Sequence, residues 1–192
     1  DLAGDIPVIN LENGRKPIEN YRIPGAAICI TNPLTFISRG IHAHDSYEFV
    51  ICNADIPSAI CGNMVYERSN NTMFAINPMQ EHGMAAEMKG FNLIGVHYDR
   101  AYFQNVAEEI FGSPYIKFEN NSSVVGYDVK MLVSLFLDEL KYDQTGHEFA
   151  MENLILVLLP VTLSGTSGIT FPQGRIIYPK TKYVISKRYW PI

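Results

Sequence analysis

Short apolar segments separated by turn-forming residues fill the first half of the chain. Residues 26–30, 73–77 and 91–98 are largely apolar, and Gly, Pro, Asn and Asp stand between such segments. Gly62-Asn63 lies between two further apolar segments and is typical of a two-residue hairpin turn, because such turns favour positive φ. Many short strands with this punctuation predict a barrel or a double-sheet sandwich.

The hydrophobic pattern becomes helical after residue 99. Phe103, Ala107 and Phe111 recur at the spacing of one helix face. Asp99 is placed to cap the start of this helix, and Gly112 is placed to end it.

Two longer helices are predicted to follow. The first covers residues 123–143, and the second begins near residue 146. Its stretch 154–159 is apolar on every side, so it must be covered on every side by its own domain or by a second subunit. The two helices therefore predict an antiparallel pair that also forms a dimer contact.

Composition separates the end of the chain from these helices. Residues 164–174 are rich in Gly, Ser, Thr and Pro, which is typical of a linker, and the basic and aromatic residues 178–189 indicate the opening of another domain. The predicted organisation is a barrel over residues 1–98, helices over 99–163, and a linker with the start of a further domain over 164–192.

Charge and cysteine content narrow the range of partners and compartments. The 192 residues carry a net charge of −5 with scattered basic residues, so this segment is not expected to bind nucleic acid by itself. Three cysteines without CxxC spacing indicate buried free thiols in a reducing cytoplasm. The longest apolar run, residues 154–161, is shorter than the ~18–20 residues of a membrane span, so no membrane partner is predicted.

Three histidines and one glutamate form the most informative polar pattern. His42, His44 and Glu48 share one face of an extended strand, because side chains alternate with period two. His82 follows a later apolar strand that ends in a turn. Three imidazoles and a carboxylate can enclose Zn²⁺, Fe²⁺ or Mn²⁺. The same residues could instead line a polar ligand site or hydrogen-bond to neighbouring loops, and the sequence leaves these alternatives open.

The pattern around these histidines resembles that of the AraC-type transcription regulators. Residues 42–48 have the form H-x-H-x-x-Y-E and run into an apolar strand, and Pro78 with His82 matches the next landmark of that family. The resemblance covers roughly residues 23–163. It implies a mostly β, cupin-like (double-stranded β-helix) barrel followed by a helical dimerisation pair. It also implies that residues 164–192 hold the linker and the start of a truncated helix-turn-helix DNA-binding domain.

Two departures bear on whether the barrel holds a catalytic metal. Enzymatic cupins usually have a Gly between the equivalents of Pro78 and His82, and this chain has none there. A Gly is also expected where this chain has Asn53-Ala54-Asp55. Both departures weaken a metal-enzyme interpretation, and many members of the regulator family are thought to work without metal.

The candidate site combines polar residues with apolar residues that could line an effector pocket. The predicted ligand-binding residues are His42, His44, Tyr47, Glu48, Met64, Tyr66, Phe74 and His82. A possible divalent metal would use His42, His44, Glu48 and His82, and no other cofactor is expected. His97 is predicted to be a partly exposed packing residue.

The predicted function is that of an effector-sensing and dimerisation module of an AraC-type regulator. A small molecule would bind in the barrel, the partner would be a second copy of the chain, and DNA would be contacted only by the missing C-terminal domain. A metal-dependent cupin enzyme, such as an isomerase or dioxygenase, is the alternative. A dimerisation module whose barrel binds nothing is the third hypothesis.

Overall fold

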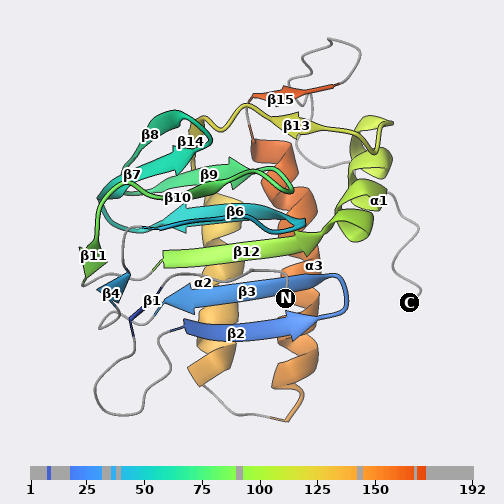
Figure 1. Ribbon diagram of the computed structural model, residues 1–192. Coiled ribbons are helices and arrows are strands. Elements are labelled where there is room, and N and C mark those ends of the chain that lie inside the picture. The colour runs from blue at the N-terminus through green and yellow to red at the C-terminus, as the bar shows by residue number, and fades with distance from the viewer. Residues whose placement is uncertain are drawn as a thin grey trace.

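The computed structural model describes residues 8–9, 18–31, 36–37, 40–89, 93–141, 145–166 and 168–171. Strands dominate its first half and helices its second (Figure 1). The strands are β1 (Val8–Ile9), β2 (Ile18–Ile23), β3 (Ala26–Thr31), β4 (Phe36–Ile37), β5 (Ile41–His42), β6 (Ser46–Cys52), β7 (Ile56–Cys61), β8 (Met64–Arg68), β9 (Thr72–Ile76), β10 (His82–Met84), β11 (Met88–Lys89), β12 (Leu93–Asp99), β13 (Lys117–Phe118), β14 (Ser122–Val124) and β15 (Ile169–Thr170). The helices are α1 (Arg100–Phe111), α2 (Tyr127–Lys141) and α3 (His147–Gly165).

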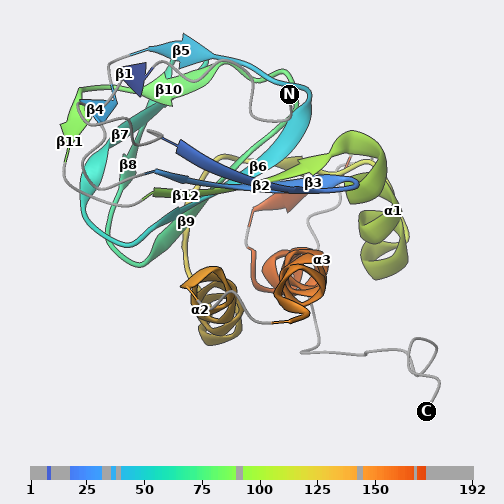
Figure 2. The ribbon, with the colours of Figure 1, turned by 90° about the horizontal axis from the view of Figure 1, so that it is seen from below.

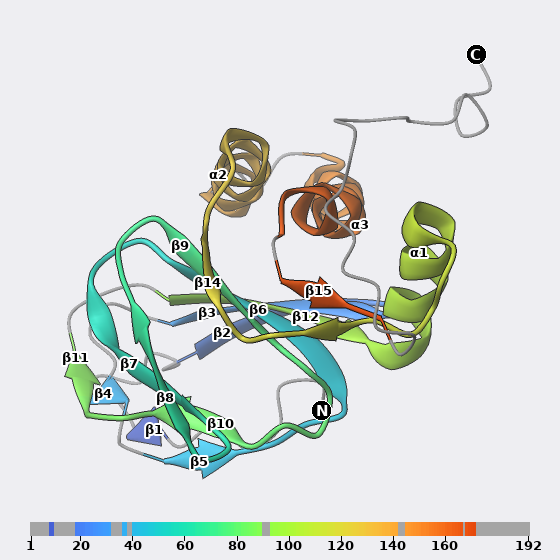
Figure 3. The same ribbon diagram turned by 90° about the horizontal axis from the view of Figure 1, so that it is seen from above.

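Two larger sheets enclose the interior of the strand-rich part. The six-stranded sheet has the order β14-β9-β6-β12-β3-β2, and the four-stranded sheet has the order β5-β10-β7-β8. Figures 2 and 3 show the two sheets facing each other. Their inner faces share one apolar cluster, to which the larger sheet contributes Val50 and Phe74 and the smaller sheet contributes Ala59 and Cys61.

Strand β6 lies at the centre of the larger sheet and is buried along its whole length. It pairs in antiparallel register with β9 on one side and β12 on the other, so that Glu48 lies opposite both Ile76 and His97. The side chains of Tyr47 and Phe49 point away from the interior into the core beneath the helices. The predicted alternation along this strand is therefore confirmed.

Helix α1 begins and ends where the sequence predicts. The Asp99 carboxylate accepts a hydrogen bond from the Tyr102 backbone N–H, which caps the first turn, and Gly112 ends the helix with a φ of 69° in the left-handed region. Phe103 is fully buried and stacks on Tyr47, with ring centroids 3.6 Å apart, which fixes α1 against the sheet.

Helices α2 and α3 lie side by side across the outer face of the larger sheet (Figures 1 and 2). Phe136 of α2 meets Tyr21 of β2 edge to face at 5.7 Å, and Ile155 and Leu159 of α3 are buried in the same core. By length and composition alone, α3 could cross a membrane, while several of its residues are buried against the sheet.

Two predicted boundaries were wrong. The second helix begins at Tyr127 rather than near residue 123, because residues 122–124 form β14 and pair with β9. In the predicted linker, α3 continues through Gly165, and β15 pairs with β13. Ile169 of β15 is buried, so this part of the chain is structured, while residues 172–192 lie outside the described residues.

The predicted fold class is confirmed, because a strand-rich, cupin-like barrel is followed by a pair of long helices. The helical part is less separate than predicted. It supplies β14 to the larger sheet, and its helices share one continuous core with β3, β6 and β12.

Candidate metal and ligand site inside the barrel

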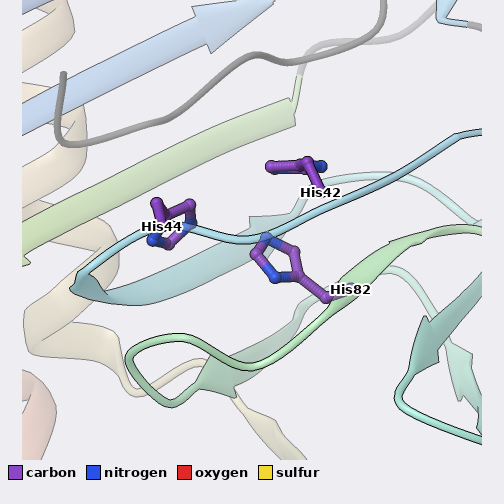
Figure 4. Close-up of side chains that lie close together, drawn as sticks. All are labelled: His42, His44 and His82. Carbon is purple, nitrogen blue, oxygen red and sulfur yellow. The ribbon is translucent and has the colours of Figure 1, made fainter.

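Four histidines and a glutamate gather between the two sheets. Figure 4 shows the rings of His42 and His44, from the segment that leads into β6, close to the ring of His82 on β10. The ring centroids of His42 and His82 are 4.2 Å apart, and those of His44 and His82 are 4.8 Å apart. Glu48 on β6 and His97 on β12 complete the group, here called the histidine cluster.

The Glu48 carboxylate lies at the centre of the histidine cluster. Its Oε2 is 3.2 Å from Nε2 of His44 and 3.1 Å from Nε2 of His82. Its Oε1 faces the other way and is 3.6 Å from Nε2 of His97. The cluster is shielded from solvent, since His44, Glu48, His82 and His97 are all buried.

Three buried ring nitrogens of the cluster make no hydrogen bond to any residue that the structure describes. They are Nδ1 of His42, Nε2 of His82 and Nε2 of His97, the last two of which nevertheless lie beside the Glu48 carboxylate. The Nδ1 of His82 is 2.7 Å from the Gln80 carbonyl and therefore carries a proton, so Nε2 offers a lone pair when the ring is neutral. Buried polar atoms are rarely left unpaired, so these nitrogens make the cluster a candidate site for a ligand.

Ser46 links two of the histidines behind the carboxylate. Its hydroxyl lies 2.8 Å from Nδ1 of His44 and 3.4 Å from Nδ1 of His97. Since a hydroxyl can accept one hydrogen bond and donate another, it can hold both rings in a defined orientation. Such outer contacts are the ones that orient histidine ligands of metals.

The electrostatics of the cluster favour neutral rings for His42 and His97 beside an ionised Glu48 carboxylate. Burial lowers the pKa of His42 to about 4 and the pKa of His97 to about 4. Burial alone would raise the pKa of Glu48, but the surrounding histidines hold that pKa well below its usual range. Burial likewise opposes protonation of His82, yet its contacts with Glu48 raise its pKa above the ordinary value.

The residues present fit a divalent transition metal. His42, His44 and His82 each offer a ligand atom within 4.8 Å of the others, and so do His44, Glu48 and His97. Neutral imidazole and carboxylate are the donors that Zn²⁺, Fe²⁺ and Mn²⁺ take in proteins, and the unpaired nitrogens supply the lone pairs. The arrangement can therefore bind a metal ion.

The structure brings the four predicted metal ligands together. Of the predicted apolar pocket-lining residues, some lie in the interior and others do not. Phe74 is fully buried in the interior cluster, and half-buried Tyr66 packs against it with ring centroids 5.5 Å apart. Met64, at the tip of the β7–β8 hairpin, is 59% exposed. Tyr47 does not line the interior, because it points to the opposite face of the sheet. There its hydroxyl donates a hydrogen bond to the Ile116 carbonyl at 3.2 Å.

The prediction for His97 was wrong, since its side chain is buried inside the barrel rather than partly exposed. Its place follows from the register of β12, which sets it directly opposite Glu48. The alternation of Ile94, Val96 and Tyr98 with Gly95 and His97 was the available signal, because it separates a polar face from an apolar face. The three cysteines are buried and free, as predicted.

No protein-family model matches the chain, and no curated protein matches it in sequence. Among solved structures, the AraC-like transcriptional activator CuxR is similar over 87% of this chain and 64% of its own, with a TM-score of 0.52 and 9% identity. ToxT K231A from Vibrio cholerae is similar over 73% of this chain and 55% of its own, with a TM-score of 0.48 and 10% identity. A cupin 2 conserved barrel domain protein from Leptotrichia buccalis is similar over 47% of this chain and 44% of its own, with a TM-score of 0.35 and 12% identity.

The likeness to CuxR concerns the fold alone. Because it covers 87% of this chain, it includes the helices as well as the barrel. The resemblance to the cupin-like half of an AraC-type regulator is confirmed at that level. The chain spans less than two thirds of the length of the CuxR structure.

Proposed function

We propose that this chain is the effector-sensing and dimerisation module of a cytoplasmic AraC-type transcription regulator. The observation that supports it is the architecture shared with an AraC-like activator along 87% of the chain. In this proposal a small molecule binds in the barrel. Its unequal affinity for two arrangements of barrel and helices shifts the population between them. DNA contact belongs to a helix-turn-helix domain outside the described residues.

The histidine cluster is the proposed binding centre of the barrel. His42, His44, Glu48 and His82 would hold a divalent transition metal, and Ser46 would orient the His44 ring through its Nδ1. When bound, the ion supplies a Lewis-acidic position to which an oxygen of the effector can bind. The chain's own side chains then exclude water, since the cluster lies between two packed sheets.

Helices α2 and α3 are the proposed dimer contact. Large apolar side chains remain on their outer surfaces although the opposite surfaces are packed on the sheet. They are Tyr127, Met131, Leu135, Phe149 and Val157, with exposed fractions of 73%, 45%, 48%, 73% and 48%. A second copy of the chain would cover this surface and account for its composition.

The dimer proposal is tested by the mass of the 192-residue chain in solution, measured by light scattering after size-exclusion chromatography. We expect a dimer, and we expect Leu135→Asp to give a folded monomer because it places a charge in the contact. Ile110→Asp is the matched control, since Ile110 is also partly exposed but lies on α1. A monomeric parent, or a dimer that survives Leu135→Asp, would contradict the proposal.

A metal-dependent cupin enzyme is the second candidate, favoured by the donor set of the histidine cluster. It predicts turnover of a substrate that is lost on removal of the metal. The sensor proposal predicts ligand binding without chemical change of the ligand. The bound compound is recovered after prolonged incubation with the metal-loaded protein. Unchanged compound supports the sensor proposal, and a converted compound supports the enzyme.

A further inference from the structure

A buried arginine faces the same interior as the histidine cluster. Arg68, the last residue of β8, is only 8% exposed. Its Nε and Nη2 donate to the Pro57 carbonyl at 3.3 and 3.1 Å, and Nη2 also contacts the sulfur of Met84. These partners lie on β7 and β10 of the smaller sheet, so the guanidinium is held inside the barrel by neutral groups.

The positive charge of Arg68 has no acidic counterpart within ion-pair distance among the residues that the structure describes. Burial lowers the pKa of Arg68, yet a guanidinium stays charged at neutral pH. Proteins normally pair a buried charge, because the desolvation of an unpaired ion is unfavourable to folding. Within the part of the chain that the structure describes, the Arg68 guanidinium is thus a buried cation without a carboxylate partner.

Arg68 and the histidine cluster are close enough to influence each other. Met84 contacts the guanidinium and shares an inward face of β10 with His82, two residues away, or about 7 Å along the strand. The charge of Arg68 opposes protonation of His82, and the charge of Glu48 acts in turn on Arg68. With a divalent ion bound, Glu48 alone would balance both the ion and the guanidinium, which leaves the interior positive.

We propose that the barrel takes a small carboxylic acid, whose carboxylate pairs with Arg68 and whose remaining polar group meets the histidine cluster. This inference rests on the proposed sensing function and names the chemical class of its effector. A guanidinium pairs strongly with a carboxylate through charge-assisted hydrogen bonds. Because Nε and Nη2 already donate to the Pro57 carbonyl, the carboxylate would approach from the Nη1 side, and the pairing would supply the missing charge.

The surroundings of Arg68 fit such a ligand. Tyr66 shares a face of β8 with Arg68 and packs on Phe74 of β9. These two rings offer apolar surface to the body of the acid. Along the same face of β8, exposure rises from buried Arg68 through half-buried Tyr66 to exposed Met64. This face of β8 is therefore most accessible to solvent at the hairpin tip.

The test compares charged probes with neutral probes of the same shape. Benzoate and acetate, each beside its amide, are titrated into the metal-loaded protein at constant ionic strength, and the melting temperature is followed. We expect the carboxylates to raise the melting temperature and the amides to leave it unchanged, since only a ligand of the folded state stabilises it. Arg68→Gln should remove the response, and Arg68→Lys should keep a weaker one.

Three results would overturn the proposal: an equal response to acids and amides, no response to any probe, or a carboxylate response that Arg68→Gln leaves unchanged. The last would assign the anion to the metal alone, which repeating the titration after chelation would verify. If Arg68→Gln does not fold, the ¹³C shift of carboxylate-labelled benzoate is measured with the chelated, metal-free parent protein. A changed shift supports pairing with the guanidinium, and an unchanged shift would overturn the proposal. The dimer mass is measured separately, so failure here is distinguishable from failure of the proposed function.

Discussion

At the scale of single residues, the histidine cluster depends on the absence of a side chain at Gly95. A Cβ at this position would lie 3.1 Å from Oε1 of Glu48 and 3.2 Å from Nε2 of His97. Both contacts are tighter than ordinary van der Waals separation, and neither group can move far inside a packed interior. Gly95 therefore leaves the room in which Glu48 and His97 face each other.

Gly95→Ala is predicted to disturb the cluster while leaving the fold in place. The added methyl group pushes the Glu48 carboxylate away from His97, so we expect metal affinity to fall by roughly 10–100-fold, the range seen when ligand-orienting contacts are lost. A competition titration with a coloured chelator measures this. Gly126→Ala is the matched control, because nothing lies within 4 Å of a Cβ there. Equal affinities in the two variants would contradict the prediction.

The same residues indicate how far the sequence predicts the site. Period-two alternation placed His42, His44 and Glu48 together correctly, and it also separates Tyr47 from them, so the pocket-lining role expected for Tyr47 conflicted with that pattern. His97 was missed because its contact with Glu48 depends on the register of two strands far apart in the chain. Such a register is a property of the folded sheet and leaves only an indirect trace in the sequence.

At the scale of elements, local sequence signals predicted both ends of α1 correctly. The predicted start of α2 was wrong because strand pairing between distant segments decides where it begins. Asp99 and Gly112 act on backbone groups within one turn, so their effect is visible in the sequence. Residues 122–124 carry no comparable signal, and they are extended because β9 offers them hydrogen bonds. Likewise, β15 was not predicted, because the composition after residue 163 is rich in Gly and Ser and the strand forms only by pairing with the distant β13.

Ile169→Ala is predicted to lower the free energy of unfolding by about 2–5 kcal/mol, the cost of removing a large buried aliphatic side chain. Ile169 is 1% exposed and belongs to the core shared by the sheet and the helices. Urea unfolding followed by circular dichroism measures the change. Thr170→Ala is the neighbouring control and should cost about 1 kcal/mol, since it removes only the hydrogen bond to the Lys117 carbonyl. Similar small changes in both variants would mean that β15 is not part of the core.

At the scale of the whole molecule, one strand connects the proposed ligand site to the proposed dimer contact. Successive side chains of β6 point to opposite faces, so Glu48 lies in the histidine cluster while Tyr47 and Phe49 lie in the core beneath the helices. Tyr47 also stacks on Phe103 of α1. A ligand that moves Glu48 therefore acts on a strand that the helices pack against, which gives a physical route for a signal.

This route predicts that the ligand site and the helices are coupled in stability. Chelation of the metal should lower the melting temperature of the whole chain in one cooperative step, because the cluster and the helix core share the strands of the larger sheet. Differential scanning calorimetry with and without a chelator checks this. Two separate transitions, with only one sensitive to metal, would show that barrel and helices respond independently.

Metal binding by the histidine cluster is the central feature of the proposed ligand site. The decisive measurement is the metal content of the purified, tag-free chain by plasma mass spectrometry, with His44→Ala and His147→Ala measured beside it. His147 is the matched control because it lies at the start of α3, outside the barrel. We predict about one equivalent of a divalent transition metal in the parent and in His147→Ala, and its loss in His44→Ala. Absence of metal from all three proteins after supplementation, or equal content in all three, would contradict the central claim.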